Sequence, residues 1–139
     1  MDRLKKEKDV RLRITTRVEG DKFITEALGE YAHDDEARYI AYKDQNGNDV
    51  TFNGLHLAKD KVYLHRAGAV SGDMLFDPKT TTRATYRTMG MKMNFIVRTH
   101  RYDVLVAEKL IVVDLRYSLQ ESAGAPPTRY ALKIEIHDV

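Results

Sequence analysis

Apolar and polar residues alternate one by one along much of this chain, and this pattern constrains the fold more than any other feature. In the segment 10–19, Val10, Leu12, Ile14 and Val18 alternate with arginine, threonine and glutamate. Successive side chains of a β-strand point to opposite faces, whereas an amphipathic helix repeats every 3.6 residues. The two-residue period therefore predicts a half-buried strand. The same pattern predicts further strands at 23–33, 37–43, 50–58, 61–67, 69–77, 81–88, 91–102, 104–119 (with a possible break near Lys109) and 129–137.

Turn residues separate these segments, as at Gly20-Asp21, 34–36, 45–48, 59–61 and 124–127. Gly, Pro, Asn and Asp favour tight turns, and no segment predicts a convincing amphipathic helix. Many short strands joined by short turns indicate an antiparallel meander, which must hide its edge strands in a barrel or a sandwich. We expect an all-β fold, a closed barrel of about eight to ten strands, as a single domain over residues 1–139, with 1–9 as a flexible N-terminal arm.

The composition narrows the class of protein further. The chain of 139 residues is long enough for one self-sufficient core, and it contains no cysteine, so disulfides, thiolate metal sites and cysteine nucleophiles are excluded. The first ten residues lack the apolar run of a secretion signal, and the apolar run 110–113 is too short to cross a bilayer. We expect a cytoplasmic protein that does not contact the membrane; the sequence leaves its homo-oligomeric state open.

The net charge of +2 is unevenly distributed. The first 20 residues carry seven Lys/Arg against four Asp/Glu, a net charge of +3, which leaves −1 for the remainder. Within that remainder, the span 78–102 has six Lys/Arg and no Asp or Glu. A local basic surface is therefore a better candidate for an anionic partner than the overall charge.

The segment 81–98 predicts a β-hairpin around a two-residue turn at Met89-Gly90. In that register Tyr86 faces Met93 on the inner side, and Arg87 faces Lys92 on the outer side. The outer side then forms a basic face of Arg83, Arg87, Lys92 and Arg98. Like charges directly opposite each other are mildly destabilising, so this face is either tolerated because it is hydrated or selected for an anionic partner such as nucleic acid or another protein.

Arg66 is the most unusual inward residue. Val62 and Leu64 are natural core positions of their strand, and alternation points Arg66 to the same side. A buried charge without partners costs several kcal/mol, so Arg66 must meet an acid, carbonyl groups, water or a bound anion. Tyr86, Thr88, Thr99 and Arg101 lie at inward positions of the neighbouring hairpin. Together these five residues form either a structural hydrogen-bond cluster or the polar end of a small-ligand pocket. We also expect Asp114 to serve as an internal partner of an arginine.

Catalytic patterns are weak. Ser71 in "GAVSGD" lacks the spacing of a nucleophile elbow, and the five histidines occur singly, without the spacing that places two metal ligands on one face. No glycine-rich loop precedes a helix. We therefore predict no catalytic residues, no metal site and no cofactor, and a protein that is not an enzyme.

The stretch "HRAGAVSGDMLFDPKTTTRATYRTMGMKMNFIVRT", with "LIVVDLRYSLQ" and "RYALKIEI" downstream, resembles the YwiB-like family of uncharacterised bacterial proteins. The similarity extends from about Val10 to Ile136. Matching positions are Arg66, Gly68 and Ala69; Met74 and Phe76; Tyr86 and Thr88; and Arg98 with Thr99. The hairpin tip departs from the family pattern, because Met89, Gly90 and Met91 replace a Pro-aromatic-Gly sequence. The resemblance implies a calycin-like barrel, similar in shape to the lipocalins, without an established activity.

Three functions are compatible with these features. The first is a non-enzymatic barrel that binds a small anionic or amphipathic ligand in its lumen near Arg66. The alternative is a protein or nucleic-acid interaction module that uses the basic outer face of the 81–101 hairpin. That face lacks the interleaved aromatic residues with which single-strand binders stack on bases. An enzyme of unrecognised class is the third.

Overall fold

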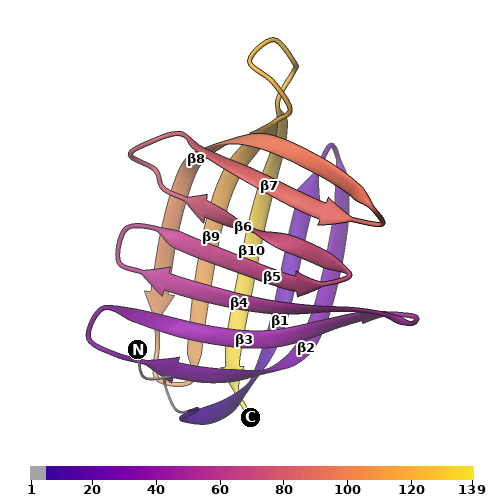
Figure 1. Cartoon of the computed structure of the whole chain (residues 1–139). Helices are drawn as coiled ribbons and strands as arrows, with labels where there is room; N and C mark the ends of the chain where they lie inside the picture. The colour runs from indigo at the N-terminus through magenta and orange to yellow at the C-terminus, as the bar shows by residue number, and fades with distance from the viewer. Residues whose placement is uncertain (1–5) are drawn as a thin grey trace.

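The computed structural model describes residues 6–139, which form ten strands in a closed antiparallel barrel (Figure 1). The strands are β1 (Lys8–Val18), β2 (Asp21–His33), β3 (Ala37–Asn46), β4 (Asp49–Ala58), β5 (Val62–Gly68), β6 (Val70–Phe76), β7 (Thr82–Thr88), β8 (Met91–Val106), β9 (Leu110–Gln120) and β10 (Thr128–Asp138). Each strand pairs with its neighbour in the sequence, and β1 pairs with β10 to close the sheet. The predicted all-β meander and its closure into a calycin-like barrel are confirmed.

Two predicted boundaries are wrong. β8 continues to Val106, so the predicted boundary at residue 103 is wrong; the turn before β9 lies at residues 107–109, which confirms the possible break near Lys109, and there the Ala107 amide donates to the Leu110 carbonyl at 2.8 Å. The N-terminal arm is shorter than predicted, because Lys8 and Asp9 already belong to β1 and the Glu7 amide donates to the Tyr31 carbonyl at 2.8 Å. Residues 1–5 of that arm lie outside the described residues.

The hairpin of β7 and β8 has the predicted register. Thr88 faces Met91, Tyr86 faces Met93 and Arg87 faces Lys92 across a two-residue turn. Met89 has φ +51° and Gly90 has φ +75°, so both turn residues adopt the positive φ that such a turn requires. The methionine at the tip therefore keeps the tight turn despite its departure from the family pattern.

A β-bulge in β8 changes the facing of the residues beyond it. The ladder to β9 pairs Thr99 with Tyr117 and then Arg101 with Arg116, which leaves His100 as the extra residue. An extra residue shifts the two-residue alternation by one position. Thr99 therefore points inward and Arg101 outward, where its guanidinium is bonded to the Asp103 carboxylate. The predicted inward position of Arg101 is wrong for this reason.

The barrel interior is mostly apolar. Val10, Leu12, Val62, Val97 and Val113 are at most 1% exposed. These residues occupy alternate positions on four different strands, as the two-residue period predicts. Fully burying a side chain of this kind stabilises the fold by about 1.5–3 kcal/mol relative to leaving it exposed. The burial of one face of the sheet therefore fixes the register of the barrel.

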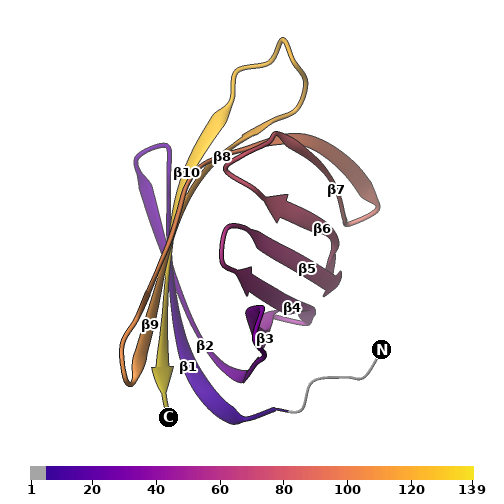
Figure 2. The same cartoon turned by 90° about the vertical axis from the view of Figure 1, so that its left-hand side faces the viewer.

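The barrel is slit between β2 and β3. Their ladder covers only residues 29–33 of β2 and 38–42 of β3. Residues 21–28 of β2 pair with β1 alone, and residues 43–46 of β3 pair with β4 alone. Figure 2 shows the β1–β2 hairpin rising away from the strands β3 to β6. The slit opens the barrel wall near the end that carries the β1–β2 and β3–β4 turns.

Gly72 is a point of close backbone approach, with φ +146°. A Cβ placed there would lie 2.2 Å from Cδ1 of Tyr86 and 2.5 Å from the carbonyl oxygen of Thr85. We predict that Gly72→Ala lowers the free energy of unfolding by about 2–4 kcal/mol, through the clash and the unfavourable φ. Chemical denaturation provides the measurement. Gly54→Ala is the matched control, because nothing lies within 4 Å of its added Cβ; equal losses at both positions would contradict the packing at Gly72.

Candidate functional site

A row of facing residues crosses five neighbouring strands near the slit end of the barrel. The ladders pair Tyr42 with Asn53, Asn53 with Arg66, Arg66 with Gly72, and Gly72 with Tyr86. Directly paired residues lie on the same face of a sheet. Since Tyr86 and Asn53 are buried, this row faces inward. The fold thus brings Arg66 and Tyr86 together, as the sequence predicted.

Gly72 allows Arg66 and Tyr86 to meet. It lies between them in the row and has no side chain, so the Tyr86 ring packs against its backbone. The guanidinium carbon of Arg66 lies 5.7 Å from the centroid of that ring. This distance is within the range of a cation–π interaction, which is worth about 0.5–2 kcal/mol. The contact orients the arginine without using its hydrogen-bond donors.

Two polar atoms of this pair lack partners within the described chain. Nε of Arg66 and the hydroxyl oxygen of Tyr86 are buried and form no hydrogen bond with residues 6–139. None of the ion pairs among those residues includes Arg66. A buried polar group without a partner costs about 1–3 kcal/mol, and more if charged. Asn53 Oδ1 is a further unpaired atom of the same row in this part of the chain. This cluster is polar and faces inward, and it is only partly satisfied, since Nδ2 of Asn53 does donate to Oδ2 of Asp44 at 3.0 Å.

A cavity of about 330 Å³ lies beside this pair. Its floor is apolar, and its polar lining comes from tyrosines, threonines, one arginine and one aspartate. The lining residues are Ile14, Thr16, Thr25, Tyr42, Asp44, Leu55, Leu64, Arg66, Met74, Phe76, Tyr86, Tyr117, Leu119, Tyr130, Leu132 and Ile134. Thr25 and Tyr42 come from the two strands that the slit separates, so the cavity reaches the slit. An apolar space with a few converging polar groups is typical of a small-molecule site.

Burial makes the cavity tyrosines harder to ionise. Desolvation raises the pKa of Tyr42 to about 12; the charge of Asp44 raises this pKa further and that of Arg66 opposes the rise. Desolvation also raises the pKa of Tyr86, Tyr117 and Tyr130. A phenol with a raised pKa remains a hydrogen-bond donor at neutral pH. The cavity therefore offers a cation and several O–H groups to an anionic ligand, and its one acidic lining residue, Asp44, accepts a hydrogen bond from Nδ2 of Asn53 at 3.0 Å.

Sequence reasoning missed six of the polar lining residues: Thr16, Thr25, Tyr42, Asp44, Tyr117 and Tyr130. Tyr117 packs against Phe76 at 4.6 Å between ring centroids and stacks on Tyr130 at 5.0 Å. Inward alternation from Ile40 and from Leu115 marks Tyr42 and Tyr117. That signal was present in the sequence, but the strand pairing was needed to bring these positions to the same end of the barrel.

The other predicted site residues lie apart from the cavity. Thr88 and Thr99 have the predicted inward facing, and Thr99 is 9% exposed, but neither lines the cavity. Arg101 is on the outer face, as described above. Asp114 also points outward, with one carboxylate oxygen 3.7 Å from Nε of Arg116, so its predicted internal position is wrong.

The basic face has the predicted composition. Arg83, Arg87, Lys92 and Arg98 are all exposed on the outer side of β7 and β8. Arg98 differs from the others because its Nη1 donates to Gln120 Oε1 at 2.5 Å. Among residues 6–139, none of these four side chains forms an ion pair. Their charges are therefore available to solvent or to a partner.

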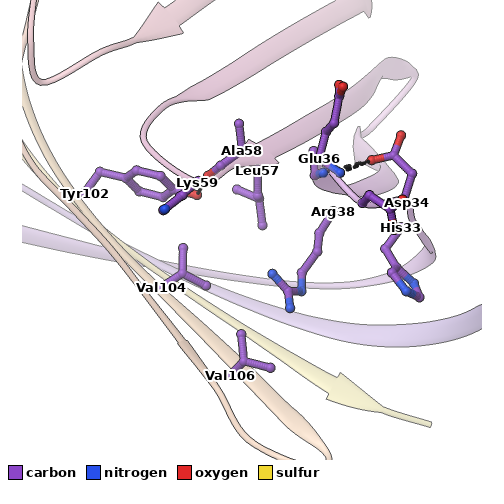
Figure 3. A pocket seen from close by; sticks show the side chains of 12 residues that line it. His33, Asp34, Glu36, Arg38, Leu57, Ala58, Lys59, Tyr102, Val104 and Val106 are labelled. Atoms are coloured by element: carbon purple, nitrogen blue, oxygen red, sulfur yellow. Dashed lines mark hydrogen bonds between the residues drawn. The ribbon is translucent and has the colours of Figure 1, made fainter.

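A second hollow, of about 360 Å³, lies at the opposite end of the barrel. Arg38 points there into the space between Leu57 and the pair Val104 and Val106 (Figure 3). Three consecutive acidic residues, 34–36, form part of its rim. Their negative charge makes this end less suited to an anion than the Arg66 cavity.

The sequence and the fold of this chain are similar to those of known proteins. The family model described as a domain of unknown function, DUF1934, matches residues 9–134. The chain belongs to this family. The crystal structure of the YwiB protein from Bacillus subtilis is similar, with a TM-score of 0.83 and 16% sequence identity over 98% of this chain and 95% of that chain. At that identity the similarity shows the fold alone.

No curated protein sequence matches the chain. No helix among residues 6–139 has the length and apolar character to span a membrane.

The raised tyrosine pKa values predict an alkaline transition. Tyr42 and Tyr102 have a pKa of about 12 when folded, against 10.0 as the ordinary value. Their contribution to stability is complete below pH 10 and is lost as the pH rises through 12, because the unfolded chain ionises first. Denaturation at a series of pH values should show this loss, and Tyr42→Phe should make it shallower. Phenolate absorbance in which all eight tyrosines of the folded protein ionise near pH 10 would contradict this assignment.

Proposed function

We propose that this DUF1934 barrel is a non-enzymatic binding protein that holds a small anionic or amphipathic molecule in the cavity at Arg66. The observation that carries the proposal is the pair of buried donors, Arg66 Nε and the Tyr86 hydroxyl, which find no partner among residues 6–139. Native proteins satisfy nearly all buried polar groups, so an unpartnered guanidinium nitrogen beside a cavity is a reason to expect a bound acceptor.

The cavity also favours a particular shape of ligand. A carboxylate or phosphate group suits the Arg66 end, because it accepts hydrogen bonds from the guanidinium and from tyrosine hydroxyls. An apolar portion suits the neighbouring part of the same wall, further along the inner face of β4 to β6, where Leu55, Leu64, Met74 and Phe76 line the cavity. A volume of about 330 Å³ is at the lower end of the range for ligand pockets, which favours a small molecule over a long lipid.

Thermal-shift measurements with medium-chain carboxylates and organic phosphates test the proposal. A compound that binds only the folded protein at 100 times its Kd adds about 2.7 kcal/mol to the free energy of unfolding. Arg66→Met should abolish this gain while it lowers the stability of the free protein by less than about 2 kcal/mol, because it removes the cation–π contact with Tyr86 but no hydrogen bond of Nε within the described chain. Tyr86→Phe should weaken the shift and preserve the ring packing.

Arg38→Met is the matched control, since it removes an arginine from the other end of the barrel and should preserve the ligand-induced shift. The proposal fails if no compound stabilises the parent protein and Arg66→Met loses about 2–4 kcal/mol under all conditions. That outcome would make Arg66 a structural residue of the barrel.

The basic face supports a second candidate function, binding of an anionic macromolecule such as RNA. Its supporting observation is that Arg87 and Lys92 lie directly opposite each other, and neither has an acidic partner among residues 6–139. Such a pair reduces stability slightly, so an anionic partner would explain its presence.

Replacement of Arg83, Arg87 and Lys92 by Gln tests this candidate. Arg98 is left unchanged because of its bond to Gln120. The triple variant should be as stable as the parent or slightly more stable, since it relieves like-charge repulsion. Filter-binding or fluorescence titration should show RNA binding by the parent that decreases steeply with salt and is lost in the variant. Binding that is absent from the parent would exclude this function.

A further inference from the structure

The slit leaves a free strand edge on β2. Residues 21–28 pair with β1 on one side, and their ladder to β3 begins only at Gly29 (Figure 2). Seven of these eight residues are exposed, with Ala27 the exception. An exposed edge carries a row of unpaired backbone N–H and C=O groups and is a template for another strand.

The turn before β2 determines which backbone groups are free. Glu19 with φ +51° and Gly20 with φ +81° form a two-residue turn, and Val18 faces Asp21 across it. Such a turn is closed by a hydrogen-bonded pair, and hydrogen-bonded pairs then alternate along an antiparallel ladder. Phe23 and Thr25 therefore direct their backbone groups to β1. Lys22, Ile24 and Glu26 direct theirs to the free edge.

The free edge also exposes apolar side chains. Phe23 is 57% exposed, Ile24 45% and Leu28 68%. Charged residues, Lys22 and Glu26, flank Ile24 at two residues on either side. The edge thus combines free backbone groups, an apolar centre and opposite charges placed symmetrically around it.

We propose that this edge pairs with the same edge of a second copy of the chain, antiparallel, with the two-fold axis at Ile24. Ile24 then faces Ile24 of the second copy, and Lys22 faces Glu26 of the second copy on each side. A closed, self-complementary contact of this kind is the usual form of a homodimer interface. Strand addition to an exposed edge is an established mode of recognition, and main-chain hydrogen bonds provide its affinity.

The charges at Lys22 and Glu26 favour a second copy of this edge as the partner and also determine the register of the pairing. A shift of two residues in one strand places Lys22 opposite Ile24 or opposite Leu28, where it has no charged partner. A shift of four residues places Lys22 opposite Lys22, or Glu26 opposite Glu26, where like charges repel. The register centred on Ile24 is the one in which both copies satisfy both charges, so the segment is complementary to itself. This proposal is independent of the lumen ligand.

The dimer should be weak, because only residues 22, 24 and 26 contribute hydrogen-bonded pairs. Sedimentation velocity over a concentration series measures it. We expect the parent to dimerise, and Glu26→Lys and Lys22→Glu each to shift the midpoint at least tenfold to higher concentration, since each places like charges opposite each other.

An equimolar mixture of these two variants should dimerise again. In the mixed dimer, the two lysines on the edge of the Glu26→Lys chain face the two glutamates on the edge of the Lys22→Glu chain. The double variant that combines Lys22→Glu with Glu26→Lys should also dimerise, because it exchanges the two charges and keeps every facing pair opposite in sign.

Asp35→Lys is the control, since it reverses an exposed charge in the β2–β3 turn, away from the edge. It should behave as the parent. The proposal is overturned if the parent remains monomeric throughout the concentration series. It is also overturned if either single charge reversal dimerises as well as the parent, or if the mixture of the two fails to recover dimerisation.

Discussion

The pairing of β1 with β10 is the constraint on which the rest of the structure depends. This ladder runs from Val10 facing Asp138 to Val18 facing Tyr130 and joins the two ends of the meander. Without it, both terminal strands would expose long edges, and the inward faces of ten strands would have no common interior. Closure gives the strands a common interior, and because side chains alternate between the two faces of a strand, it fixes which residues reach the lumen. The position of Arg66 and of each cavity tyrosine follows from that closure.

Features that depend on residues close together in the sequence could be predicted, whereas features that depend on pairing between distant strands could not. The β7–β8 hairpin was predicted residue by residue because a two-residue turn fixes the register locally. The facing of Arg101 was not, because the bulge at His100 adds one residue and no local pattern marks it. Arg66 and Tyr86 were predicted to face inward, but Tyr117 and Tyr130 joined them only through pairing between strands far apart in the sequence. The absence of a full β2–β3 ladder was also not predicted, since alternation shows which residues face inward but not how long a ladder extends.

Gly72 and Arg66 show how the barrel carries a polar site in its interior. A side chain at residue 72 would separate Arg66 from Tyr86, and its absence allows a cation–π contact to replace a salt bridge. An acidic side chain at residue 72 would have formed a salt bridge with Arg66, and the guanidinium would then no longer be available to an anionic ligand. The contact instead orients the guanidinium and leaves Nε without an acceptor among residues 6–139. The cost in stability is tolerable because the apolar positions elsewhere in the barrel, such as Leu12 and Val113, are fully buried.

The slit between β2 and β3 connects the two proposals, although neither rests on the other. The lumen ligand would use the inner side of the slit, near Thr25 and Tyr42, whereas a second copy would use the backbone edge of β2. Thr25 directs its backbone to β1 and its side chain to the cavity, while the adjacent Ile24 and Glu26 direct their backbone to the free edge. Residues 22–26 of β2 therefore border both proposed sites. If both sites are occupied as proposed, any change in ligand affinity caused by dimerisation must be matched by an equal change in dimer affinity caused by the ligand, because coupling between two binding equilibria is reciprocal.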